Sequence, residues 1–95
     1  MTHIVEHAQS GSGGAFFIMQ DGKRIAEMTY RLSGSQLAII DHTEVLASLR
    51  GQGVARQLLD AAVKWARGSH IKLGATCSYA VVQLARDKSL QDVRG

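Results

Sequence analysis

The sequence predicts one domain of the α+β class, in which a meander of strands precedes a helix. The chain has 95 residues, of which 45% are hydrophobic, and chains of this size rarely divide because division begins only beyond about 250 residues. Before Arg50 apolar residues alternate with polar ones, whereas after Arg50 they recur at every third or fourth position. We therefore expect residues 1–95 to fold as a single domain with a small core.

Four segments of the first half have strand character and follow one another as a meander. They are residues 3–8, 15–20, 24–32 and 37–45. The Asp21-Gly22 pair favours a two-residue hairpin turn, because both residues tolerate positive φ. The Ser/Gly run at 10–14 has no side chain able to anchor it, so we expect a mobile loop there. Residues 37–40 are apolar in succession, which is typical of a central strand.

The second half predicts a helix, a fifth strand and a short terminal helix. The apolar positions that share one face of the long helix are Val54, Leu58, Ala62 and Trp65. This pattern predicts a helix over residues 53–67, ended by Gly68 in the left-handed conformation. A strand at 71–76 follows, and then a helix at 79–88 with a helical pattern through Val81, Val82, Leu84 and Ala85. Because a strand, a crossover helix and a strand form a βαβ unit, the fifth strand should be parallel to the fourth.

Charge is distributed unevenly along the chain. Residues 1–48 carry five acidic and three basic side chains, whereas residues 49–95 carry eight basic and three acidic ones. The basic half suits nucleic acid, an acidic membrane surface or a phosphorylated ligand, because long-range attraction does not identify the anion.

No apolar run approaches the roughly 18 residues of a membrane-spanning helix, and no signal peptide is recognisable. We therefore expect a cytoplasmic protein without a membrane partner. The single cysteine, Cys77, excludes an internal disulfide, and with scattered histidines it cannot form a structural zinc site, so no metal is expected.

The segment between the fourth strand and the long helix has the most chemical content. It places Gly51 and Gly53 at the predicted first turn, where unpaired N–H groups and the helix dipole attract an anion. Arg50 and Arg56 could add charge at the rim. On these residues alone, a phosphate cradle and a tight loop that only sets the helix entry are equally supported. The pattern is neither the Rossmann fingerprint nor a P-loop, which argues against the common nucleotide-binding folds.

The run Arg50-x-x-Gly53-x-Ala55 resembles the acetyl-CoA pyrophosphate loop of the GNAT N-acetyltransferase superfamily. More of the chain, from His42 to Tyr79, is similar to the small single-domain GNAT-like proteins related to bacterial YjdJ. The resemblance implies a compact GNAT-like fold whose sheet splays between strands four and five. Two departures are Leu46-Ala47, where members often have proline, and Asp87-Lys88-Ser89 in place of a His-Pro-Glu-like stretch. They bear on the acceptor pocket and the terminal helix rather than on the loop.

The resemblance also implies acetyl-CoA as the cofactor and a set of residues that hold it. The pantetheine arm would follow the fourth strand to its end, and the pyrophosphate would lie on the backbone of residues 51–55. The expected cofactor-binding residues are Val45, Arg50, Gly51, Gln52, Gly53, Val54, Ala55 and Arg56.

Four further side chains are candidates for catalysis. His42 and Glu44 are two residues apart on a strand and so share a face; if that face is the cleft, Glu44 could order a water and His42 could act as base. Otherwise they are a half-exposed strand end. Cys77, just before the last helix, could accept the acetyl group, form a disulfide with CoA, or only pack. Tyr79 could protonate the leaving thiolate or merely cover the core.

Three functions remain open on the sequence. The leading one is an acetyl-CoA-dependent N-acetyltransferase that acts on an unidentified amine, as a monomer or weak homodimer. The second is a CoA-binding or sensing protein without turnover. The third, a small basic nucleic-acid-binding domain, is disfavoured, because Phe16 and Phe17 point to opposite faces and form no stacking pair among basic residues.

Overall fold

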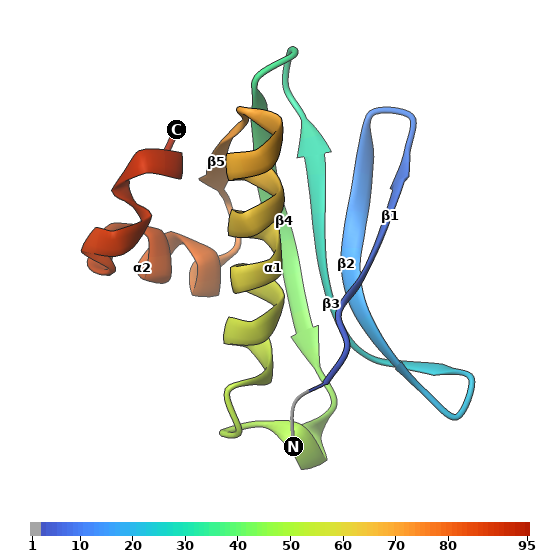
Figure 1. The fold of residues 1–95 in the computed structure, drawn as a ribbon. Helices are drawn as coiled ribbons and strands as arrows, with labels where there is room; N and C mark the ends of the chain where they lie inside the picture. The colour runs from blue at the N-terminus through green and yellow to red at the C-terminus, as the bar shows by residue number, and fades with distance from the viewer. Residues whose placement is uncertain (1–2) are drawn as a thin grey trace.

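The computed structural model describes residues 3–95, which form one five-stranded sheet with helices on one side (Figure 1). The elements in chain order are β1 (Glu6–Ser10), β2 (Gly13–Gln20), β3 (Lys23–Leu32), β4 (Leu37–Val45), the 3-10 helix η1 (Ala47–Leu49), α1 (Val54–Ser69), β5 (Lys72–Ala75), α2 (Ser78–Arg86) and the 3-10 helix η2 (Lys88–Val93). The strand order is β1-β2-β3-β4-β5. The first four strands pair antiparallel, and β5 pairs parallel to β4. The predicted meander and βαβ unit are confirmed.

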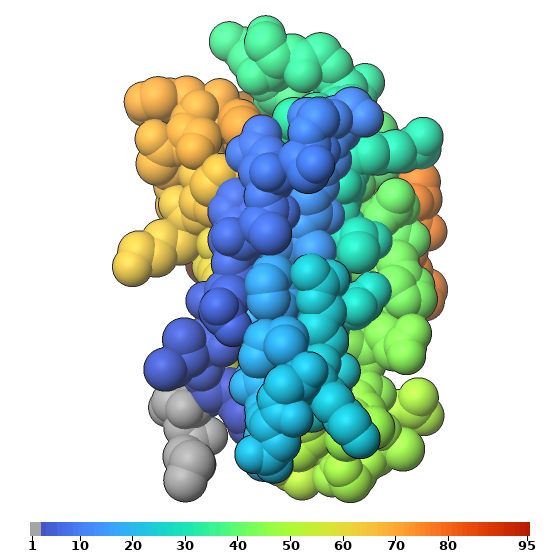
Figure 2. All heavy atoms as spheres, turned by 90° about the vertical axis from the view of Figure 1, so that its right-hand side faces the viewer, coloured from blue at the N-terminus to red at the C-terminus, as the bar shows by residue number. Residues whose placement is uncertain are grey.

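Helix α1 packs on one face of the sheet and closes the core. Its inner face buries side chains at the predicted helical spacing, namely Val54, Leu58, Leu59, Ala62, Val63 and Ala66. They meet buried residues of β3 and β4, including Met28 and Ile40. The opposite face of the sheet is open: in Figure 2 the strands β1 to β4 lie side by side with no helix over them. An antiparallel sheet tolerates such exposure because its strands alternate between apolar and polar residues. We call this the outer face.

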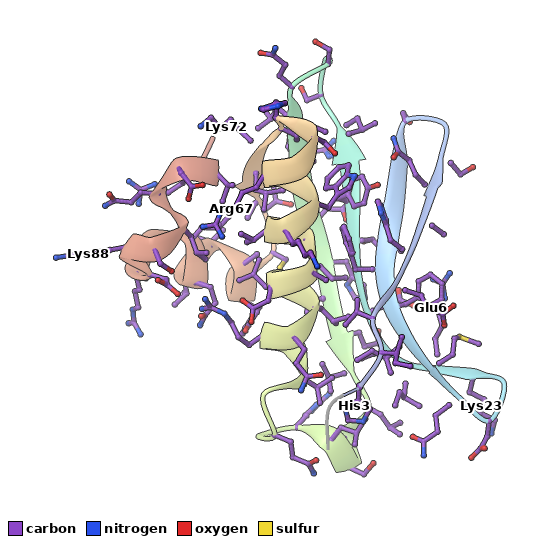
Figure 3. The ribbon with its side chains drawn as sticks, in the orientation of Figure 1. His3, Glu6, Lys23, Arg67, Lys72 and Lys88 are labelled. Carbon is purple, nitrogen blue, oxygen red and sulfur yellow. The ribbon has the colours of Figure 1, made fainter. Side chains whose placement is uncertain are left out.

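The C-terminal segment is held to α1 and to the start of β5. Arg67 of α1 donates from Nε to Asp92 at 2.9 Å, and the Lys72 ammonium contacts the Asp92 carbonyl oxygen. Both cations lie on the side where the chain ends (Figure 3). Lys72 pairs with Leu37 at the beginning of β4, which is the end of the sheet away from the loop at 50–53.

Three expectations about individual segments are wrong. The run at 10–14 is no mobile loop: it forms the β1–β2 hairpin, with a turn at 11–12 and Gly13 and Gly14 inside β2. Helix α1 continues through Gly68 to Ser69, and His70 takes the left-handed conformation with φ of 56°. In α2 the buried residues are Ala80 and Leu84, whereas the two valines predicted for its core side are exposed.

Within residues 3–95, no helix is both long and apolar enough to cross a membrane.

Candidate functional site

Strands β4 and β5 separate halfway along β4. Their pairing runs from Leu37 with Lys72 to Ile40 with Ala75. Beyond Ile40 the chain of β5 turns away, and both Thr76 and Cys77 donate their N–H groups to the Ile40 carbonyl, at 2.9 and 3.3 Å. The last four residues of β4, from His42 to Val45, pair only with β3. One edge of this segment therefore has no strand beside it, as the expected splay requires.

The loop after β4 leads into an uncapped helix N-terminus. Gly53 is the N-cap residue of α1, and no side chain caps the helix. Gln57 is the first helical residue whose N–H reaches a carbonyl of the preceding turn, that of Gly53, at 3.1 Å. The amides of Val54, Ala55 and Arg56 therefore have no acceptor in the described helix, and such groups attract anions.

Glycine is required at position 53 by its backbone conformation. Its φ is +76°, and a Cβ built there would meet nothing within 4 Å. A side chain would thus be strained by the dihedral angle and would occupy the open space in front of the helix amides. Gly51 has the same two properties, with φ of +81°.

These residues line a cavity of about 270 Å³ between the end of β4, the first turn of α1 and the first turn of α2, which we call the loop hollow. Its lining residues are Val45, Leu49, Arg50, Gly51, Gly53, Val54, Ala55, Arg56 and Tyr79. The Arg50 Nε donates to the Val45 carbonyl at 3.3 Å, which ties the loop to the strand end. Gln52 does not line the hollow; its amide donates to the Ser48 carbonyl at 3.2 Å. The structure thus gathers most of the residues predicted to hold the cofactor, together with Tyr79.

Arg56 differs from the free rim charge that the sequence suggested. Its Nε donates to Asp60 at 2.9 Å, and its two terminal nitrogens donate to Gln83 at 2.8 Å and to Asp87 at 2.5 Å. The hydrogen bonds that Arg56 donates to Asp87 and Asp60 raise the pKa of Arg56. Hydrogen bonds from the Ser89 hydroxyl and from Arg56 lower the pKa of Asp87 to about 2. The guanidinium therefore joins α1 to α2.

Tyr79 and Cys77 lie at the start of α2. Burial raises the pKa of Tyr79, the Arg56 charge lowers it, and Asp60 and Cys77 raise it. The phenol therefore stays protonated around neutral pH and can donate a proton. The Cys77 side chain caps α2 by accepting the Ala80 N–H at 3.4 Å. Its Sγ also lies 3.2 Å from Thr43 Oγ1.

His42 and Glu44 share a face, but they face away from α1. The β3–β4 register shifts between Ile40, which pairs with Tyr30, and His42, which pairs with Thr29. Asp41 is therefore an extra residue, a β-bulge that reverses which side chains face the core. Thr43 now faces the helix side, and His42 Nε2 contacts Glu44 Oε2 at 3.2 Å on the outer face, where both side chains are more than half exposed.

Two residues of this region carried no signal in the sequence. Thr43 was one polar residue in a strand, and its partner Cys77 is 34 positions away. Asp87 lies in a stretch that departs from the family pattern, and its partner Arg56 is 31 positions away. No group of three or more His, Cys, Asp or Glu side chains suited to a metal occurs in the described part of the chain.

Known proteins resemble this chain in sequence and in fold. The family described as GCN5-related N-acetyl-transferase matches residues 15–93. A GCN5-like protein from Staphylococcus aureus, solved by NMR, is 38% identical with a TM-score of 0.75, covering 95% of this chain and 87% of that chain. A search of curated proteins found no match.

Two liganded structures share the fold at lower identity. A GNAT family acetyltransferase from Elizabethkingia anophelis with acetyl-CoA bound is 21% identical with a TM-score of 0.61, and the match covers 78% of this chain and 50% of that one. The aminoglycoside N-acetyltransferase AAC(6')-Iy in complex with CoA is 22% identical, again with a TM-score of 0.61, over 80% of this chain and 67% of that one. The family match spans most of the chain and agrees with the splayed sheet and the open helix N-terminus, so this chain belongs to the GCN5-related N-acetyltransferase family, a family of acyltransferases.

Proposed function

We propose that this chain transfers an acetyl group from acetyl-CoA to an amine. The observation that carries the proposal is the uncapped first turn of α1, which opens beside the strand segment that β5 leaves unpaired. The amides of Val54, Ala55 and Arg56 suit a pyrophosphate, because they are unpaired donors at the positive end of a helix. The space in front of Gly53 admits a phosphate oxygen close to the backbone. The residues present therefore fit acetyl-CoA.

Further residues of the chain would contact acetyl-CoA between its pyrophosphate and its acetyl group. The unpaired edge of β4 up to Val45 suits an extended arm carrying amide groups, because free backbone N–H and C=O groups need partners. Arg50 adds positive charge at the rim of the loop hollow. Acetyl-CoA supplies an activated acetyl group as a thioester.

Proton transfers fall to Tyr79, His42 and Glu44 in this proposal. The amine nitrogen must lose a proton as it bonds to the acetyl carbon, and the sulfur must gain one as its bond to that carbon breaks. Tyr79, in the loop hollow, donates the second proton. His42 and Glu44 lie on the outer face next to the same strand segment, so they accept the first proton from an amine that approaches from that face. In a two-step variant, the Cys77 sulfur bonds to the acetyl carbon as the bond from that carbon to the CoA sulfur breaks, and the Cys77 thiol proton passes to the CoA sulfur. The amine then takes the acetyl group from Cys77, whose sulfur regains a proton.

A second candidate function, CoA binding without turnover, is favoured by the open outer face, since no element of residues 3–95 walls an amine site there. Two measurements separate the alternatives. Acetyl-CoA at 100 times its dissociation constant should stabilise the fold by about 2.7 kcal/mol, and free thiol should appear when amines or peptide pools are added. Stabilisation without thiol release would support the sensor. Stabilisation by an oligonucleotide but not by acetyl-CoA would contradict both the acetyltransferase function and CoA binding without turnover.

A further inference from the structure

Arg56 is the residue that joins the two helices bordering the loop hollow. It belongs to the first turn of α1, yet two of its three guanidinium nitrogens bind α2 and its C-terminal end, through Gln83 and Asp87. The third binds Asp60 one turn along α1. Every nitrogen of the group is thus used, and two carboxylates offset its charge.

Asp87 is in turn fixed by its own neighbours. One of its carboxylate oxygens accepts the N–H and the hydroxyl of Ser89, at 2.9 and 2.6 Å, while the other accepts Arg56. The residue caps η2, where the chain leaves α2. A side chain held at both oxygens gives Arg56 a defined anchor rather than a flexible surface contact.

The position of this network matters for Tyr79. Tyr79 lies in the first turn of α2 and lines the loop hollow together with Arg56. Helix α2 buries only Ala80 and Leu84 completely. Besides the cysteine cap and the Arg56 bonds, its side-chain hydrogen bond to the rest of the described chain is the one that Arg94 donates to the Leu84 carbonyl at 3.4 Å. A short helix with so little buried surface needs another attachment to hold a side chain in place.

We propose that Arg56 is a positioning residue: anchored by Gln83 and Asp87, it fixes α2, and therefore Tyr79, against the first turn of α1. The proposal rests on the proposed function for the role of Tyr79 as the proton donor. Arg56 then has two roles: its backbone amide faces the anion site, and its guanidinium joins α1 to α2. Acetyl-CoA affinity should then depend little on the guanidinium, whereas turnover should depend on it strongly.

A matched pair of variants tests the attachment without requiring activity. Arg56→Gln removes the link between α1 and α2, and Arg67→Gln removes a comparable ion pair, Arg67 with Asp92, at the other end of α1. Amide exchange in α2 should quicken by about tenfold or more in Arg56→Gln and little in Arg67→Gln, because exchange reports local opening. The carbon NMR signals of the two tyrosines supply a second readout: the Tyr79 signal should shift in Arg56→Gln, while that of Tyr30, on β3, serves as reference. Unchanged exchange and an unmoved Tyr79 signal would overturn the proposal.

A double-mutant cycle tests whether Arg56 acts through Tyr79. In Arg56→Gln we expect kcat to fall about tenfold or more, as general acid catalysis contributes about 10²–10⁴-fold, with the KM for acetyl-CoA changed by less than about threefold. Arg56→Lys should not restore kcat, because an ammonium lacks the planar fork that spans two helices. In a Tyr79→Phe background the loss of kcat caused by Arg56→Gln should largely vanish, and full additivity would overturn the proposal.

If the wild-type chain releases no thiol, the proposed function fails, and the exchange and NMR measurements still decide whether Arg56 attaches α2 to α1. Should Arg56→Gln not fold, Asp87→Asn and Gln83→Leu each remove one anchor and are measured in its place.

Discussion

The Thr43 hydroxyl and the Cys77 thiol lie 3.2 Å apart and join β4 to the start of α2, just beyond the point where β4 and β5 stop pairing. Thr43 is two residues before Val45, and Cys77 is two residues before Tyr79. Residues proposed for the pantetheine arm and for proton donation are thus connected by one side-chain contact across the splay. Thr43 reaches this place only because the bulge at Asp41 turns it toward the helix side.

Replacing Cys77 separates its structural role from a chemical one. Cys77→Ala removes the α2 cap and should cost about 1 kcal/mol of unfolding free energy, the usual loss for a deleted N-cap. Cys77→Ser should retain the cap, since a hydroxyl accepts the same N–H. If Cys77 carries the acetyl group, intact mass after incubation with acetyl-CoA should show an adduct in the wild type and none in Cys77→Ser. Full turnover in Cys77→Ser would instead establish direct transfer.

A leucine at position 53 should weaken acetyl-CoA binding. The substitution fills the space in front of the helix amides and strains a backbone with φ of +76°. Gly34→Leu is the matched control: Gly34 has φ of +74°, equally open surroundings, and lies in the β3–β4 turn at the opposite end of β4. Both variants should lose about 1–2 kcal/mol from left-handed strain. Calorimetric titration should show at least about tenfold weaker binding only for Gly53→Leu, and equal affinities in the two variants would refute the cradle.

The order of the elements follows from periodicity and turn residues, and the parallel pairing of β5 with β4 follows from the βαβ rule. The alternation in residues 24–32 and the spacing of Val54, Leu58 and Ala62 reflect burial against a single core, which the sequence records directly. The grouping of residues 50–56 beside the first turn of α1 was predictable as well, because these residues follow one another in the chain. Contacts between distant residues, such as Thr43 with Cys77, leave no such local pattern.

Local backbone geometry accounts for the errors at residues 10–14 and at the end of α1. The glycines at 13–14 looked like a loop, but a Cβ at Gly14 would lie 2.5 Å from the Tyr30 hydroxyl oxygen, so glycine there permits close strand packing. Helix α1 passes Gly68 because the Ile71 N–H closes on the Ala66 carbonyl at 2.9 Å, which places the left-handed residue at His70. The bulge at Asp41 places His42 and Glu44 on the outer face, a point that the sequence left open. A strict alternation cannot anticipate one inserted residue.

The pH dependence of stability should report on His7. This residue stacks on Phe16 with ring centroids 4.1 Å apart, and its Nε2 lies 2.7 Å from the Tyr30 hydroxyl. Burial lowers the pKa of His7 from 6.5. Below pH 6.5 the unfolded chain therefore binds more protons at this site than the folded one, so stability falls as pH drops from 6.5 toward the folded-state pKa. Thermal melts of wild type and His7→Phe should diverge in this window, with the shallower slope in His7→Phe; parallel curves would contradict the assignment.

Variants on the outer face should change the reaction with the amine without changing acetyl-CoA binding. His42 and Glu44 contact each other there and do not line the loop hollow. His42→Ala and Glu44→Gln should therefore leave acetyl-CoA affinity within about twofold of wild type, while kcat/KM for the amine falls about 10²-fold if either accepts the proton. Glu6→Gln is the control, since Glu6 is an acidic residue of the edge strand β1, three strands away from β4. Its kcat/KM should match that of the wild type. Undiminished kcat/KM in both His42→Ala and Glu44→Gln would remove these two residues from the reaction.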